Sequence, residues 1–172
     1  MKRLFFALWP SDATREKIIE FDDLLTDPRL KKVATKNLHV TLVFLGLLDE
    51  KQEQNIIKAA NNIAASSINM RFDQLTLWQQ KRGILCLTST SQPKSLLTLV
   101  KQLQDSVSEQ GIELEQRPYT AHITLARNLK QHPEINVEAI PWHSDKFVLV
   151  HSVSTDHGVD YQIIDSWPLA TN

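Results

Sequence analysis

The stretch Ala121-His122-Ile123-Thr124-Leu125-Ala126-Arg127 repeats the core of an earlier stretch, Leu38-His39-Val40-Thr41-Leu42. Both contain His-x-Thr-Leu in a short apolar run that includes β-branched residues, which favours a strand over a helix. Residues i and i+2 of a strand point to the same side, so each copy is expected to place an imidazole beside a hydroxyl. The histidines are 83 positions apart in a chain of 172 residues. This spacing predicts two related halves that face one another across a cleft.

The paired motif can be weighed against a purely structural role. A single histidine in a strand is usually a satisfied core or surface residue, and threonine is common in strands for steric reasons. Two polar pairs on the same face of two apolar strands, however, depart from the expected pattern twice in the same way. We therefore interpret the two pairs as parts of one functional site.

Length and charge limit the class of protein. We expect residues 1–172 to form a single bilobal domain, because this length is ample for one hydrophobic core. With 19 Lys and Arg against 20 Asp and Glu, the net charge is −1. This balance argues against a protein that binds polyanions through a broadly basic surface, but it is compatible with binding a small or terminal phosphate.

Two further features indicate the compartment. Cys86 is the only cysteine, so it forms no internal disulfide; it fits a reduced cytosolic compartment and is interpreted as a small buried hydrophobe. The apolar stretch within residues 1–10 is shorter than the roughly 18 residues of a membrane helix and lacks a small-residue cleavage site. We read it as the first strand and expect a cytoplasmic protein that does not associate with a membrane.

Hydrophobic periodicity gives the expected elements. Strands are predicted over 4–9, 38–45 (ended by Gly46), 72–78, 84–88, 112–116, 121–127, 147–153 and 161–164; helices over 11–25, over 50–66, and from 91–93 to Gly111; a turn at Lys81-Arg82-Gly83; and loops over 29–37 and 130–141. Four basic residues in the first of these loops fit a solvated loop and a positive rim leading into His39 equally well: Arg29, Lys31, Lys32 and Lys36. The order of elements predicts an α+β fold. Two antiparallel-rich sheets are expected to be related by a pseudo-two-fold axis around the cleft, with helices on their outer faces.

The residue types in the two motifs suit phosphodiester chemistry. An unperturbed pKa near 6.5 allows one of two neighbouring histidines to act as an acid and the other as a base at neutral pH. The hydroxyls of Thr41 and Thr124 can donate to phosphate oxygens, and Arg127 offers a planar guanidinium that matches them. Arg127 also fits an ordinary surface arginine at a strand end. Attack by water and departure of an alkoxide need opposed proton transfers, which an acid and a base supply.

Other kinds of site fit less well. Neither motif has further ligands at zinc-binding spacing, no Gly-rich phosphate loop is present, and no nucleophile elbow accompanies a serine or Cys86. The remaining histidines have no repeated partner and are interpreted as surface or structural residues: His132, His143, His151 and His157.

The double motif resembles the signature of the two-histidine phosphoesterases, specifically the LigT-like RNA 2′,3′-cyclic phosphodiesterases. Asn37-Leu38 before the first motif, Phe44-Leu45-Gly46 after it and the opening Arg3-Leu4-Phe5-Phe6-Ala7 resemble that family as well. Two positions depart from the family pattern. Ala121 stands where proline usually precedes the second histidine, and Tyr119 stands where phenylalanine is commoner.

The resemblance implies a bilobal fold, no cofactor or metal, and opening of a terminal ribose 2′,3′-cyclic phosphate to a 2′-phosphomonoester, with 2′–5′ RNA ligation as a secondary capability. It implies that His39 is the acid that protonates the departing 3′ oxygen and His122 the base that activates water, while Thr41, Thr124 and Arg127 hold the phosphate. The implied partners are RNA ends, tRNA fragments among them, or nucleoside cyclic phosphates, and a monomer is expected. Two alternatives stay open: another cyclic phosphate such as that of ADP-ribose, and a nucleotide-binding module without turnover.

Overall fold

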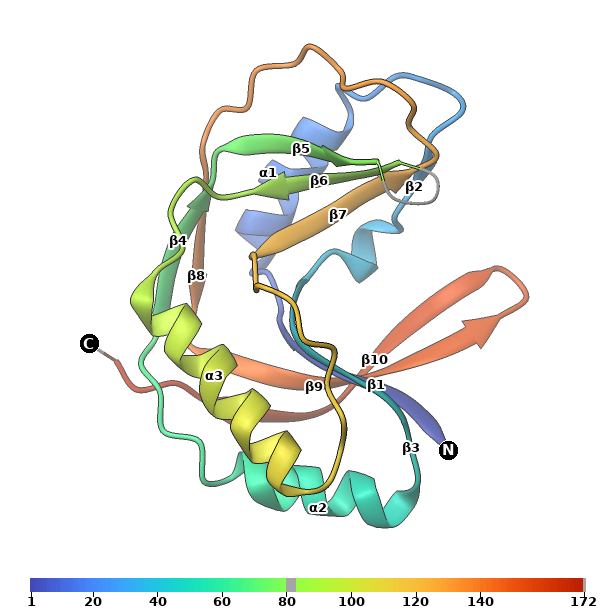
Figure 1. Ribbon diagram of the computed structural model, residues 1–172. Helices are drawn as coiled ribbons and strands as arrows, with labels where there is room; N and C mark the ends of the chain where they lie inside the picture. Colours follow the sequence, from blue (N-terminus) through green and yellow to red (C-terminus); the bar gives the residue numbers. More distant parts are fainter. Residues whose placement is uncertain (80–82, 172) are drawn as a thin grey trace.

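The computed structural model describes residues 1–79 and 83–171. Within these residues the chain forms two four-stranded antiparallel sheets, one two-stranded sheet and three α-helices (Figure 1). The predicted α+β class is therefore confirmed.

The first sheet has the strand order β10-β9-β1-β3. Its strands are β1 (Lys2–Leu8), β3 (Val40–Leu48), β9 (Lys146–Thr155) and β10 (Gly158–Pro168). The apolar run of β1 is buried on both faces. Leu4, Phe6 and Leu8 lie in the main core, whereas Phe5 and Ala7 lie in a second, smaller cluster. This explains why β1 is continuously hydrophobic rather than alternating.

The second sheet has the order β2-β7-β6-β5. It consists of β2 (Lys31–Lys32), β5 (Gln74–Trp78), β6 (Ile84–Thr88) and β7 (His122–Arg127). The first motif thus begins an edge strand of one sheet, since His39 directly precedes β3. The second motif lies on β7, which is separated from the sheet edge only by the two residues of β2.

The remaining elements close the structure around one core. The strands β4 (Ile68–Phe72) and β8 (Ile140–Ser144) pair with each other, and the helices are α1 (Asp12–Asp22), α2 (Glu50–Ala60) and α3 (Lys94–Glu109). Side chains that accept from backbone N–H groups start two of the helices, Ser11 for α1 and Asp49 for α2. One continuous hydrophobic cluster includes residues of both large sheets and all three helices. The two halves are consequently packed together rather than joined by a linker.

Several predicted boundaries were wrong. Residues 112–116 form no strand, because Ile112 packs on the core while the backbone has no neighbouring strand to pair with. The helix predicted over 50–66 ends at Ala60, where the helix-breaking pair Asn61-Asn62 follows. The helix predicted to reach Leu25 ends at Asp22.

Other differences concern strands. Residues 72–78 belong to two strands, β4 and β5, and the loop predicted over 130–141 already contains the start of β8. Gly46 lies inside β3 with φ 78°, beside a register shift in the pairing with β1, rather than ending the strand. β9 and β10 extend beyond the predicted 147–153 and 161–164. Lys81 and Arg82 of the predicted turn lie outside the described residues.

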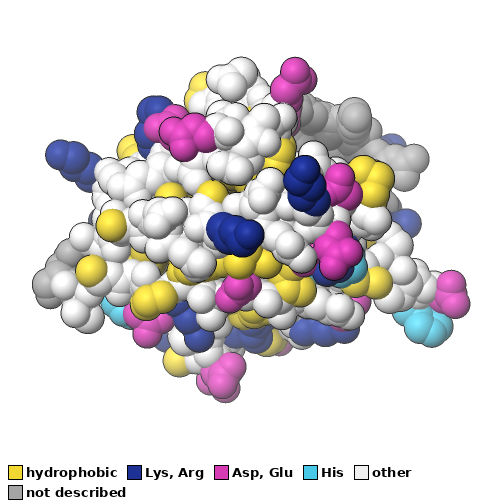
Figure 2. All heavy atoms as spheres, turned by 90° about the horizontal axis from the view of Figure 1, so that it is seen from below, with side chains coloured by type: hydrophobic (Ala, Val, Ile, Leu, Met, Phe, Trp, Pro, Cys, Tyr) yellow, Lys and Arg dark blue, Asp and Glu magenta, His cyan; other side chains and the backbone are white. Residues whose placement is uncertain are grey.

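The surface carries charges of both signs. Figure 2 shows one face, on which Lys and Arg side chains are scattered among Asp and Glu side chains. This agrees with the net charge of −1. In the described part of the chain, no helix is both long enough and apolar enough to cross a membrane.

Candidate active site

His39 is held by two hydrogen bonds at the start of β3. Its Nδ1 lies 2.6 Å from the carbonyl oxygen of Asn37, and its Nε2 lies 2.9 Å from Oγ1 of Thr41. A carbonyl oxygen only accepts, so Nδ1 carries the proton and Nε2 accepts from the Thr41 hydroxyl. The imidazole and the hydroxyl are therefore on the same side, as the strand spacing predicts.

His122 repeats half of this arrangement. Its Nδ1 lies 2.9 Å from the carbonyl oxygen of Thr120, again two residues earlier in the chain. The neutral ring therefore donates from Nδ1 and presents its lone pair at Nε2. The hydroxyl of Thr124 has a different neighbour, the Sγ of Cys86 at 3.8 Å. The repeat thus extends from residue types to the hydrogen bond that sets each tautomer.

Aromatic rings surround both imidazoles. Trp9 stacks on His39, with ring centroids 5.5 Å apart and an interplanar angle of 14°. Phe5 and Tyr161 approach the same ring at 5.0 Å and 5.1 Å. Sequence analysis missed these contacts, because an aromatic in an apolar strand is usually a core residue and Tyr161 is remote in sequence.

The second imidazole has an aromatic neighbour of its own. The rings of Trp78 and His122 are edge to face, with centroids 4.6 Å apart. Each motif histidine therefore lies beside one tryptophan.

Burial lowers the pKa of both histidines. The pKa of His39 falls to about 4 because desolvation outweighs the bond to Asn37, and positive charge on His122 lowers it further. The pKa of His122 is also lowered, by desolvation and by the charge of Arg117, against the bond to Thr120. Both rings are consequently neutral at pH 7 in the ligand-free protein, whereas the sequence led us to expect one protonated ring.

The two motifs meet at one site. Charge on one histidine affects the pKa of the other, and β3 contacts β7. Between the halves, the Tyr119 hydroxyl donates to the carbonyl oxygen of Thr41 over 3.1 Å. The segment that precedes the second motif is therefore tied directly to the first.

Arg127 lies toward this site. It is exposed at the end of β7. Burial raises the pKa of Tyr161, and the positive charge of Arg127 opposes that rise. Since Tyr161 contacts the His39 ring, the positive charge of Arg127 acts on the same region as that histidine.

The basic segment before His39 is largely neutralised. Lys36 pairs with Asp160, Arg29 with Asp27 and Lys32 with Asp22, which favours a solvated segment over a positive rim. The segment is not a loop throughout, because Lys31–Lys32 form β2 and Thr35–Asn37 form a 3-10 helix.

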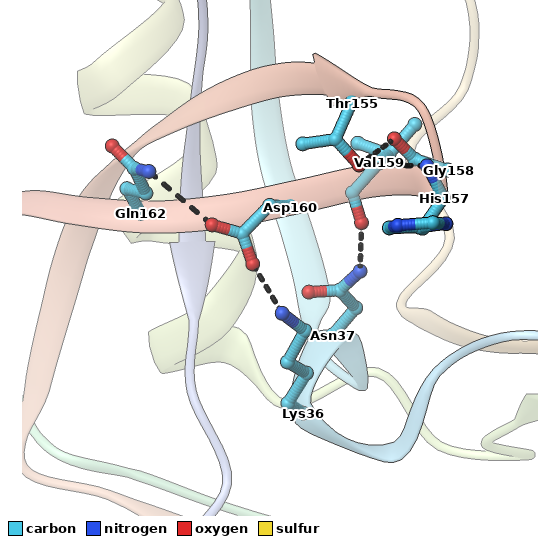
Figure 3. Close-up of polar contacts among 8 residues, drawn as sticks. All are labelled: Lys36, Asn37, Thr155, His157, Gly158, Val159, Asp160 and Gln162. Atoms are coloured by element: carbon cyan, nitrogen blue, oxygen red, sulfur yellow. Dashed lines mark hydrogen bonds and ion pairs between the residues drawn. The ribbon is translucent and has the colours of Figure 1, made fainter.

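Asn37 next to Lys36 has a more specific contact. Its buried side-chain amide donates to the carbonyl oxygen of Val159 on β10 over 2.7 Å (Figure 3). The same residue thus fixes the carbonyl that orients His39 and anchors it to the hairpin of β9 and β10.

The other histidines lie apart from the motifs. His132 hydrogen-bonds to the carbonyl oxygen of Leu75, and His143 to Oδ1 of Asn69, each over 2.7 Å. His157 lies in the turn between β9 and β10, and His151 is half-buried in β9.

Neither metal ligands nor surface shape identifies the site. Among residues 1–79 and 83–171, no three His, Cys, Asp or Glu side chains are grouped so that they could hold a metal ion. Of two surface hollows, one lies near Leu30 and His132 and the other beside α1, near Lys17 and Ala139; neither is lined by His39 or His122. The site is therefore recognised from its chemistry and geometry.

Comparison with known proteins shows similarity to phosphoesterases. The profile of the family described as LigT like phosphoesterase matches residues 8–86, which include the first motif. The RNA 2′,3′-cyclic phosphodiesterase of Escherichia coli K12 is 29% identical over 142 residues, covering 82% of this chain and 80% of its own length.

Two crystal structures resemble the whole fold. One, of a phosphoesterase, superimposes with a TM-score of 0.91 at 27% identity. The other is Escherichia coli LigT complexed with 3′-AMP, with a TM-score of 0.87 at 26% identity. Each comparison covers 98% of both chains. The similarity therefore extends across both motifs.

Proposed function

We propose that this chain, which is similar to the LigT-like phosphoesterases of the two-histidine group, hydrolyses the terminal 2′,3′-cyclic phosphate of RNA or of a nucleoside to a 2′-phosphomonoester. The observation that carries this proposal is the matched pair of imidazoles. Each has Nδ1 bound to a carbonyl oxygen, which leaves Nε2 as the nitrogen that can exchange a proton with substrate; in His39 this nitrogen accepts from the Thr41 hydroxyl. A binding module has no need of two such groups.

The reaction needs one proton on the pair. Both rings are neutral at pH 7 before substrate binds, because burial lowers their pKa values. The negative charge of a bound phosphodiester raises the pKa of a nearby imidazole, so one ring gains a proton with the substrate. Nε2 of His122 then takes a proton from the attacking water as the new P–O bond forms. The P–O3′ bond breaks, and Nε2–H of His39 gives its proton to the departing oxygen.

Three further residues are proposed to hold the phosphate. The Thr41 hydroxyl donates to Nε2 of neutral His39. Once that nitrogen is protonated it no longer accepts a hydrogen bond, so the Thr41 hydroxyl is free to donate to a phosphate oxygen instead. Thr124 is proposed to donate from the second motif, and Arg127 to bind two phosphate oxygens at once through its planar fork.

The remaining parts of the proposal rest on the sequence. We propose that the protein works as a monomer and a single domain in the cytoplasm on RNA ends, including tRNA fragments, and that 2′–5′ ligation is a secondary capability.

The proposal is tested with purified protein and 2′,3′-cyclic AMP. We expect 2′-AMP as the product, resolved from 3′-AMP by chromatography. We also expect turnover to fall by roughly 10² or more in His39→Ala and in His122→Ala, with near-UV circular dichroism unchanged. Binding without turnover would support a nucleotide-binding module. Turnover of the cyclic phosphate of ADP-ribose alone would support a different substrate.

The assignment of acid and base has its own test. A phosphodiester with a much better leaving group no longer needs the acid. On such a substrate we expect His39→Ala to recover much of its lost rate and His122→Ala to stay inactive. The opposite result would exchange the two roles.

A further inference from the structure

One peptide unit in front of His122 is held from both sides. The carbonyl oxygen of Thr120 accepts from Nδ1 of His122 over 2.9 Å. The N–H of the next residue, Ala121, belongs to the same peptide unit and donates to Oε1 of Gln92 over 3.0 Å. A peptide unit is planar, so its N–H and C=O turn together. Fixing the N–H therefore fixes the carbonyl that orients the histidine.

Gln92 is well placed for this task, because it is fixed itself. Its Nε2 donates to the carbonyl oxygen of Ser89 over 3.1 Å, so both ends of the side-chain amide are used. Gln92 directly precedes Pro93, the N-cap of α3. The acceptor for Ala121 is thus anchored where β6 leads into a long helix.

The segment in front of His122 needs such support. Residues 112–121 have no regular secondary structure, so no ladder of backbone hydrogen bonds sets the orientation of the 120–121 peptide. Ala121 is fully buried, and water is not available to replace a lost partner of its N–H. A proline at this position, as in the family pattern, would have no N–H to donate.

From this geometry we propose that Gln92 is a positioning residue for His122, which acts through the 120–121 peptide. The inference builds on the proposed function only for its effect on rate. The bond from Nδ1 to Thr120 leaves the lone pair at Nε2, the form that the base requires. Without Gln92 the peptide is free to turn. The ring then loses both its fixed tautomer and the contribution of that bond to its basicity.

The decisive measurement is an NMR titration of the His122 ring without substrate. In Gln92→Met, which keeps the chain length but removes the amide, we expect a smaller fraction of the Nδ1–H tautomer and a lower pKa of His122, while His39 titrates unchanged. With 2′,3′-cyclic AMP we expect kcat to fall several-fold with little change in KM. Gln102→Met is the matched control, since Gln102 also donates to a loop carbonyl, that of Ala64 over 3.1 Å, and does not contact either motif.

Two more variants separate positioning from simple destabilisation. Gln92→Glu keeps an acceptor for the Ala121 N–H, and we expect it to retain the wild-type tautomer. Ala121→Pro removes the donor, so adding Gln92→Met to it should change the His122 titration no further. A Gln92→Met protein that is less stable but titrates like the wild type would overturn the proposal. The proposal would also be overturned if Gln92→Met changed the His122 titration as much in the Ala121→Pro protein as in the wild type. If the wild type failed to hydrolyse the cyclic nucleotide, the proposed function would fall, but the titration would still decide the role of Gln92.

Discussion

His39 and His122 share a mode of support that their sequence spacing alone does not show. Each ring donates from Nδ1 to the carbonyl oxygen two residues earlier, and burial lowers the pKa of each. The orientation of both imidazole rings is therefore fixed by backbone carbonyl groups, and their protonation is set by the surroundings.

The pH dependence of kcat/KM follows from these lowered pKa values. The active form carries one proton on the pair, and its population is greatest between the two macroscopic pKa values. Both lie below the ordinary value of about 6.5, so we expect a bell whose maximum lies below about pH 6.5. Above it the pair is neutral and lacks the acid; below it both rings are protonated and the base is lost. Initial rates at low substrate concentration measure the profile, and a maximum above about pH 7 would contradict it.

The contribution of Arg127 depends on the shape of its guanidinium. We expect Arg127→Lys to lower kcat/KM by about tenfold or more, because a point ammonium cannot bind two phosphate oxygens in one plane. Arg29→Lys is the control, since Arg29 pairs with Asp27 on an exposed loop. Wild-type kinetics for Arg127→Lys would return Arg127 to an ordinary surface role.

Among single residues, the sequence identified those whose partner lies within a few positions along the chain. The His-x-Thr spacing is enough to place His39 beside Thr41. The contribution of Gln92 was missed, because its partner Ala121 is 29 residues away and a glutamine before a helix carries no distinguishing pattern. Trp9 and Tyr161 were missed because each contacts His39 from a distant part of the sequence.

At the level of elements, the sequence predicted two kinds of strand. One is the continuously apolar strand that is buried on both faces, and the other is the pair of strands that carry the repeated motif. The start of β8 was read as loop because it contains Pro141. The structure accommodates this proline in a two-stranded sheet, where it is exposed and opposite Arg71. The reverse error arose at 112–116, where alternating apolar residues pack on the core without a pairing partner. Pairing is a property of the neighbours, which the segment itself does not encode.

Gly83 illustrates such a neighbour effect at the start of β6. A Cβ at this position would lie 1.6 Å from the carbonyl oxygen of Leu129, and φ is 65°. Gly111 has a similar φ of 76° but nothing within 4 Å of a built Cβ. We expect Gly111→Ala to cost about 1 kcal/mol in the free energy of unfolding and Gly83→Ala at least roughly 2 kcal/mol more. Urea denaturation measures both free energies of unfolding. Equal losses in the two variants would show that the backbone at Leu129 shifts at little cost to make room for the added Cβ.

On the scale of the whole molecule, the candidate active site lies where two halves share one core. The main hydrophobic cluster includes both sheets, and Tyr119 bonds to the first motif from the segment before the second. The repeat of the two motifs predicted two related halves; the cleft expected between them stays a prediction. The two-stranded sheet of β4 and β8 was not predicted, since its strands are 68 residues or more apart in sequence.

Global stability should fall in mild acid because of the buried histidines. Their pKa values are lower in the folded state than in the unfolded chain, so below about pH 6.5 the unfolded state binds more protons and the free energy of unfolding decreases. For His39 the loss continues down to its folded pKa of about 4. We expect the decrease between about pH 7 and pH 5 to be smaller in His39→Ala than in the wild type. Urea denaturation at the two pH values measures this decrease in both proteins, and equal decreases would contradict the prediction.

The placement of the tryptophans gives the two halves separate optical signals. Of the four tryptophans in the sequence, Trp142 and Trp167 are buried in the core, while Trp9 lies on His39 and Trp78 on His122. A protonated imidazole quenches the fluorescence of an adjacent indole. Trp78→Phe therefore leaves an emission that follows the charge on His39, and Trp9→Phe leaves one that follows His122, so the movement of a proton from one half to the other becomes visible without any added label.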